Sequence, residues 1–132
     1  MTPQEIFDRV VEHLYKQGNR STDTRLCRYH NEDGTKCAIG VLIPEDIYFE
    51  EIDQNNRSIK YLLAQYKDKF PEWMHENVAL LSELQSVHDK QHNWSSVENM
   101  VKALYSVAQY HNLNSDIIGK NEFYPVVDKE EE

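Results

Sequence analysis

The sequence predicts an α+β fold with about four main helices on one face of a small antiparallel sheet, which is built around a hairpin over residues 26–43. Apolar residues recur at helical spacing in four segments, and the stretch from Cys27 to Pro44 combines turn residues with apolar alternation. A hairpin alone is marginally stable in water, so we expect the helices to cover it.

The first helix is predicted over residues 3–17. Thr2 and Glu5 form a capping box, Pro3 suits the first helical position, and Gly18 suits the C-terminal end. The apolar stripe between these signals consists of Ile6, Phe7, Val10, Val11 and Leu14.

The hairpin follows, because Asn31 and Gly34 have the chemistry of a three-residue turn. This turn places His30 opposite Lys36 and Tyr29 opposite Cys37, with the apolar side chains of both strands on one face and His30 on the other. The residues expected to shape the hairpin are Cys27, Tyr29, Asn31, Asp33, Gly34, Cys37, Gly40 and Pro44.

Three more helices are predicted after a charged loop over residues 50–57. Ser58 caps one that ends before Pro71, a second runs from Pro71 to near Asn93, and a capping box from Ser95 to Glu98 opens the last, which ends near residue 113. Residues 1–113 therefore form one globular domain, and residues 114–132 an acidic, partly ordered tail.

Charge is distributed unevenly along the 132 residues. Residues 1–44 are neutral, whereas residues 45–132 carry seventeen acidic and eight basic side chains and so the whole net charge of -9. This balance argues against direct nucleic-acid binding and suits a protein partner with a basic surface, although such charge also serves simply to keep a protein soluble. With two cysteines, no signal peptide and no apolar run of membrane-spanning length, we expect a cytoplasmic protein.

Two patterns resemble metal sites. Cys27, His30 and Cys37 have zinc-like spacing, but the hairpin register points His30 away from both cysteines and leaves the cysteines too far apart for a disulfide. His88 and His92 are weak candidates one helical turn apart, since a third ligand is missing. We therefore expect no metal, no cofactor and reduced cysteines.

Catalytic signals are weak. The chain has four glycines and no phosphate-binding loop or nucleophile elbow, and both cysteines are expected among apolar neighbours that raise a thiol pKa. A non-enzymatic protein is therefore favoured. Two alternatives stay open: a small metal-dependent or cysteine/histidine hydrolase built on His88, Asp89 and His92, with or without Cys37, and a protein that sequesters a small ligand.

The segment of residues 47–53 is the predicted partner-binding site. It mixes aromatic and acidic side chains without a clear period, which is common at interfaces. The alternative is a loop that packs Tyr48 and Ile52 onto the hairpin. The expected contact residues are Tyr48, Phe49, Glu50, Glu51 and Asp53.

Three segments together resemble a group of small bacterial and phage proteins without an assigned activity: MTPQEIF at the start, C-x-Y-x-x-x-D-G-x-x-C-A-x-G-x-L-I-P over residues 27–44, and L-L-x-x-L-Q-x-x-H-D over residues 80–89. The resemblance covers residues 1–113 and transfers no catalytic residue. It implies an accessory protein or inhibitor, encoded by a phage or mobile element, that binds and modulates a host or defence macromolecule.

Overall fold

The computed structural model describes most of the chain. The described residues are 1–18, 22–23, 26–27, 29–30, 36–43, 46–49, 51–53, 57–120 and 122–123, with only the backbone described for 22–23 and 26–27.

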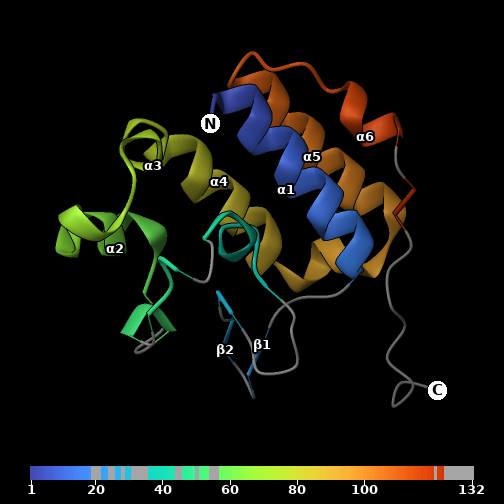
Figure 1. The fold of residues 1–132 in the computed structure, drawn as a ribbon. Coiled ribbons are helices and arrows are strands. Elements are labelled where there is room, and N and C mark those ends of the chain that lie inside the picture. The colour runs from blue at the N-terminus through green and yellow to red at the C-terminus, as the bar shows by residue number, and fades with distance from the viewer. Residues whose placement is uncertain are drawn as a thin grey trace.

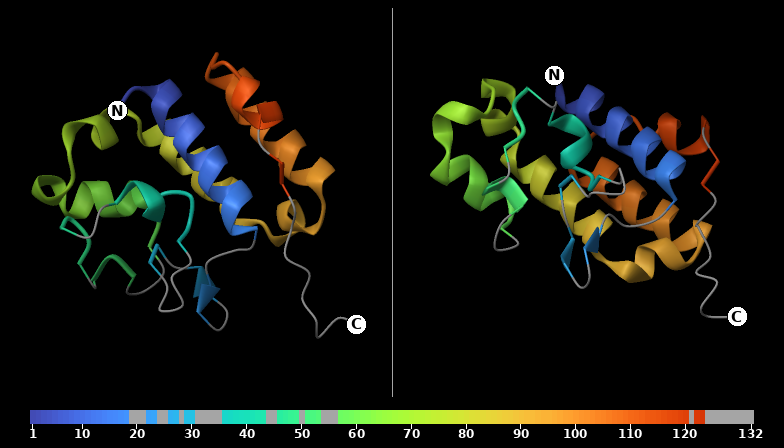
Figure 2. Two further views of the ribbon diagram at one scale, coloured as in Figure 1. Left: turned by 45° about the vertical axis from the view of Figure 1, so that its right-hand side comes forward. Right: turned by 60° about the horizontal axis from the view of Figure 1, so that its bottom comes forward.

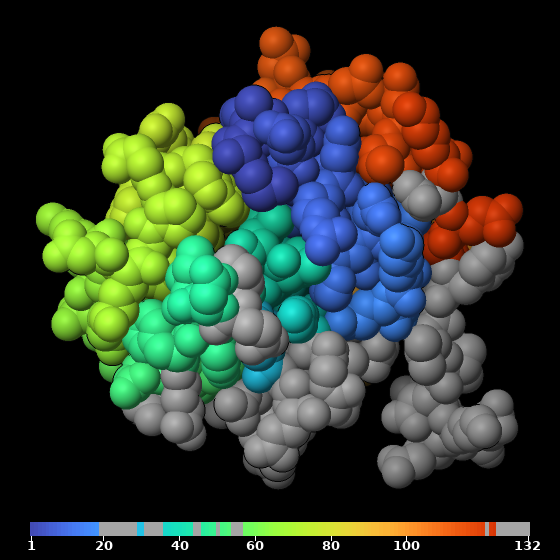
Figure 3. Space-filling view, viewed as in Figure 1, coloured from blue at the N-terminus to red at the C-terminus, as the bar shows by residue number. Residues whose placement is uncertain are grey.

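Three longer helices form the centre of the fold (Figure 1): α1 (Pro3–Gln17), α4 (Val78–Asp89) and α5 (Val97–Tyr110). The short helix α6 (Asp116–Lys120) contacts both α1 and α5. Near the N-terminal end of α4 lie α2 (Ile59–Gln65) and α3 (Glu72–Glu76), as both views of Figure 2 show. The face drawn in Figure 3 carries α1, in blue, beside the green and yellow-green atoms of the α2 and α3 region.

The fold is all-α, so the predicted α+β architecture is wrong. Within the described residues, strand pairing is limited to β1 (Thr22–Asp23) with β2 (Leu26–Cys27) and to one isolated antiparallel bridge between His30 and Lys36. Within the described residues, the apolar stripes of α1, α4 and α5 pack against one another and not against a sheet. The core contains, among others, Ile6, Phe7, Val10, Leu14, Leu81, Leu84, Met100 and Leu104, all fully buried.

The predicted hairpin register is right where His30 lies opposite Lys36 and Tyr29 opposite Cys37, and it is wrong beyond Cys37. The His30–Lys36 bridge forms, and the Cys37 amide donates to the Tyr29 carbonyl at 3.3 Å. The chain then leaves the ladder at residues 38–39 and forms a 3₁₀ turn, η1 (Gly40–Leu42). Continued to its end, the predicted register would place Cys27 opposite Ile39, whereas Cys27 pairs with Thr22.

A close backbone approach at Gly40 explains why the strand stops. A Cβ atom on Gly40 would lie 1.9 Å from the Tyr29 carbonyl oxygen, so only glycine fits where the turn crosses this residue. The turn buries Ile39, Leu42 and Ile43 together, whereas a strand would place Leu42 on the face opposite Ile39 and Ile43. Four residues of the predicted hairpin, Asn31, Asp33, Gly34 and Pro44, lie outside the described residues.

Helix α1 matches its prediction at both ends. Thr2 Oγ1 accepts from the Glu5 amide at 3.1 Å, Glu5 Oε1 accepts from the Thr2 amide at 2.9 Å, and Gly18 ends the helix with a φ of 71°. Ser58 caps α2 as expected, while the cap of α5 is Ser96, one residue later than the predicted start of the capping box.

The predicted helix from Pro71 to Asn93 is divided into three parts. It breaks at Asn77, whose side-chain amide donates to the Trp73 carbonyl at 2.7 Å and so competes with the helical hydrogen bond at that position. After Asp89 the chain continues as a 3₁₀ helix, η4 (Gln91–Ser95). No helix in the described part of the chain has the length and apolar character needed to span a membrane.

Candidate functional site

The carboxylate of Asp53 anchors the predicted partner-binding segment to the preceding chain. It accepts hydrogen bonds from the backbone amides of Tyr29, at 2.6 Å, and His30, at 3.2 Å. The Tyr48 hydroxyl donates to the same carboxylate at 2.5 Å. Asp53 thus joins residues 29–30 to residues 48–53 through charge-assisted hydrogen bonds, which are stronger than neutral ones.

His30 and Tyr48 reinforce this connection by stacking. Their rings lie 4.1 Å apart between centroids and are inclined by only 8°. His30 Nε2 lies 2.8 Å from the Gly40 carbonyl oxygen; since a carbonyl only accepts, this nitrogen carries the proton. The stack is therefore also tied to η1 (Gly40–Leu42).

The Tyr29 hydroxyl connects the same region to the helices. It donates to the Arg57 carbonyl at 2.8 Å and accepts from Gln85 Nε2 on α4 at 2.6 Å. Gln85 Oε1 in turn accepts from the Ile59 amide in the first turn of α2 at 3.0 Å. Tyr29 is only 4% exposed, and this burial raises the pKa of its hydroxyl.

Phe49 and Ile52 hold the segment from its apolar side. The Phe49 ring meets Tyr66 edge-on at 5.1 Å and lies 6.3 Å from Phe70, with Lys69 Nζ 5.0 Å above it. Ile52 is fully buried. Ile52 is thus buried and Tyr48 half-buried, which agrees more closely with the alternative of a loop packed against the rest of the chain.

The outward side of this segment is acidic. Asp46 and Glu51 are exposed, whereas Tyr48 and Phe49 are half-buried and Asp53 directs its carboxylate into the network described above. Glu50, the remaining predicted contact residue, lies outside the described residues.

The thiol that the hydrolase alternative needs lies in the core. Cys37 is 2% exposed, is not in a disulfide, and its Sγ accepts from the Gly40 amide at 3.2 Å. Burial raises the pKa of this thiol, which disfavours the reactive thiolate.

The histidine pair predicted on one helix is separated. His88 is fully buried on α4, with Nδ1 2.9 Å from Asp89 Oδ1, and its carbonyl accepts from Trp94 Nε1 at 2.8 Å. His92 is exposed in η4, beyond the end of α4, so the expected one-turn spacing is lost. Among the described residues, no group of three His, Cys, Asp or Glu side chains is placed to hold a metal ion.

Two residues of α1, His13 and Gln17, bind the backbone of Lys36. These contacts were not predicted from the sequence. Gln17 accepts from the Lys36 amide at 2.8 Å and donates to its carbonyl at 2.9 Å, as a paired strand would. His13 Nε2 lies 2.9 Å from the same carbonyl oxygen. The available signal was the position of both polar side chains on one side of an amphipathic helix, one turn apart.

Comparison with protein-family models found no match, and comparisons with curated proteins and with solved structures found no significant similarity.

Proposed function

We propose that this protein acts by binding a partner protein with a basic surface, and that residues 46–53 form the contact. The observation that carries this proposal is the anchoring of the segment by Asp53, which receives two backbone amides and the Tyr48 hydroxyl. A segment already fixed in one conformation loses little conformational entropy on binding, and this favours affinity.

The charge of the segment supports a basic partner. Residues 45–56 contain five acidic residues and no basic residue, a single-sign run within a chain of mixed charge. Asp46 and Glu51 are exposed, and the half-buried rings of Tyr48 and Phe49 lie beside them. Aromatic side chains next to charged rims are common at protein interfaces. Charge complementarity here speeds the encounter and selects among partners.

Burial of Cys37 and His88 favours binding over catalysis by these two side chains. Cys37 and His88 are 2% and 0% exposed, so neither side chain can touch a substrate without a change in the core. The inhibitor or accessory role suggested by the resemblance fits a binding function of this kind.

A charge-reversal series tests the proposal. The protein is immobilised, proteins retained from a lysate of its source cells are identified and purified, and their association rates are measured over a range of salt concentrations. Asp46→Lys with Glu51→Lys is compared with Asp68→Lys with Glu76→Lys, which reverses two exposed acidic residues elsewhere. Asp53 is left unchanged because its carboxylate fixes the segment.

We expect slower association and a weaker salt dependence for the first double variant alone, because exposed charges act over about 10 Å at 0.1 M salt. Equal rates for wild type and both double variants would overturn the proposal.

A further inference from the structure

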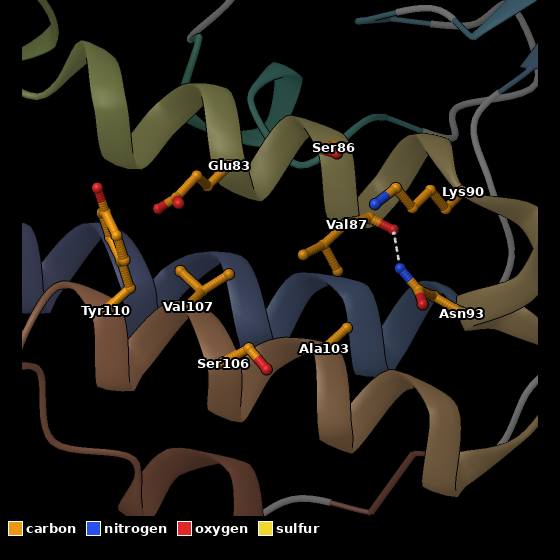
Figure 4. Close-up of a pocket in the computed structure, with 9 residues that line it drawn as sticks. All are labelled: Glu83, Ser86, Val87, Lys90, Asn93, Ala103, Ser106, Val107 and Tyr110. Carbon is orange, nitrogen blue, oxygen red and sulfur yellow. Dashed lines mark hydrogen bonds between the residues drawn. The ribbon is translucent and has the colours of Figure 1, made fainter.

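An open groove of about 420 Å³ lies between α4 and α5, on surface that the proposed function does not use. Figure 4 shows side chains from both helices directed into it. The lining residues are Glu83, Ser86, Val87, Lys90, Asn93, Ala103, Ser106, Val107 and Tyr110.

The groove is built from two stripes of equal length. One stripe begins at Glu83 on α4 and ends at Lys90, the residue that follows this helix, and the other runs from Ala103 to Tyr110 on α5. Each has lining residues at positions i, i+3, i+4 and i+7. Each stripe is about 10 Å long. The helices are antiparallel, so Glu83 and Tyr110 lie at one end of the groove and Lys90 and Ala103 at the other (Figure 4).

The two ends differ in charge and in size. One end has the carboxylate of Glu83, which is paired with His111, together with the large ring of Tyr110. The other has the ammonium group of Lys90 and the small side chain of Ala103. Tyr110 is 77% exposed, the most exposed of the large hydrophobic side chains in the described part of the chain.

We propose that this groove binds a second copy of the same chain in a two-fold symmetric dimer. The two-fold axis would lie in the interface, across both helices at the middle of the stripes, between Ser86 and Val87 on α4 and between Ser106 and Val107 on α5. Rotation about this axis turns the second copy over and reverses the direction of its groove. Helix α4 of one copy then packs on α4 of the other, and α5 packs on α5.

This symmetry satisfies charge and shape at once. Glu83 of each copy meets Lys90 of the other, and Tyr110 of each copy meets Ala103 of the other, so each contact forms twice. Every pair of neighbouring helices is antiparallel, which is the arrangement of an up-down four-helix bundle. A large ring against a small side chain permits close packing in that interface.

The proposed dimer is tested by reversing single charges in the groove and then restoring opposite charges with a second substitution. Sedimentation equilibrium is measured on the wild-type chain at concentrations up to about 1 mM. High concentrations are needed because stripes of two helical turns bury a small area and give a weak dimer. We expect a dimer, and we expect Glu83→Lys and Lys90→Glu each to raise its dissociation constant at least about tenfold, because like charges then meet twice.

Two rescues separate this symmetry from other arrangements. The double variant with Glu83→Lys and Lys90→Glu restores opposite charges and should dimerise again. An equimolar mixture of the two single variants should form the mixed dimer, because the two basic groove ends of one variant then meet the two acidic groove ends of the other. The control is Glu12→Lys with Lys16→Glu, which swaps an exposed pair on α1 and should leave dimerisation unchanged.

Tyr110→Ala gives a second measurement that does not alter charge. This side chain is exposed in the monomer, so its removal should weaken the dimer without unfolding the chain. A wild-type chain that stays monomeric at the highest concentration would overturn the proposal. So would a dimer that neither the charge variants nor Tyr110→Ala weakens, or the absence of rescue in folded variants.

Discussion

Gly40 lies directly against Tyr29: the position of a Cβ atom on Gly40 is 1.9 Å from the Tyr29 carbonyl oxygen and 2.7 Å from its carbonyl carbon. These are backbone atoms, so they cannot rotate away as a side chain would. The contact lets the 3₁₀ turn cross the chain at the point where Asp53, His30 and Tyr48 meet. The conformation of the candidate binding segment therefore depends on the absence of a side chain at Gly40.

The first prediction is that Gly40→Ala destabilises the protein by about 3 kcal/mol, since the added methyl group forces the backbone apart. Urea unfolding measures this change. Gly119→Ala in α6 is the matched control, because a Cβ there meets nothing within 4 Å. It should instead add up to about 1 kcal/mol through helix propensity. A similar effect of both substitutions would contradict the proposed close approach.

The second prediction concerns Asp53→Asn, which keeps the size of the side chain but places a donor where the carboxylate accepts from backbone amides. We expect a loss of about 1–3 kcal/mol in the free energy of unfolding and weaker partner binding. Glu51→Gln nearby is exposed, so it should change stability by no more than about 0.5 kcal/mol. Equal stability of the two variants would show that Asp53 does not fix the segment.

A third prediction contrasts two buried tyrosines. Tyr29→Phe removes a hydroxyl that binds Gln85 and Arg57, and it should cost about 1–3 kcal/mol because buried polar groups lose their partner. Within the described part of the chain the Tyr15 hydroxyl is buried without a hydrogen-bond partner, and burial raises its pKa to about 12. Tyr15→Phe should therefore be neutral within about 0.5 kcal/mol, or stabilising. Chemical denaturation of both variants decides the question, and the opposite order would be incompatible with this network.

The fourth prediction is that the Cys37 thiol does not react with a thiol reagent while the protein is folded, because the thiol is buried and its pKa is raised. Cys27→Ser removes the other thiol, so the signal comes from Cys37 alone. Absorbance after addition of an aromatic disulfide should stay flat in buffer and rise by one equivalent in denaturant. Rapid labelling of the folded variant would instead reopen the cysteine hydrolase alternative.

The fifth prediction concerns pH. Burial lowers the pKa of His13 by more than the contact with the Lys36 carbonyl raises it, and the nearby charges of Arg9 and Lys36 lower it further. The unfolded chain therefore binds more protons than the folded one at mildly acidic pH. This contribution to stability is complete above the ordinary histidine pKa of about 6.5 and is lost as the pH falls below it.

Urea unfolding at a series of pH values, for wild type and His13→Gln, measures this effect. We expect a shallower decline in the variant between about pH 7 and pH 5, because the variant has no proton to bind at this site. Parallel curves for the two proteins would contradict a buried, neutral His13.

Local signals in the sequence were sufficient for α1, for the cap of α2 and for the pairing of His30 with Lys36. In each case the interactions join residues close in the chain: a capping box, a single serine cap and a bridge between residues six positions apart. The core positions of α1 also followed from apolar spacing alone.

The tertiary structure decided the fold class and the candidate site. Residues 37–43 have the alternation of a strand, but the crossing of Gly40 over Tyr29 turns them into a 3₁₀ turn. Asp53 lies in a charged segment that reads as a solvated loop in the sequence. Its carboxylate nevertheless accepts hydrogen bonds from backbone amides more than twenty positions earlier in the chain. Long-range contacts of this kind leave no period in the sequence, because they depend on where the packed helices place each segment.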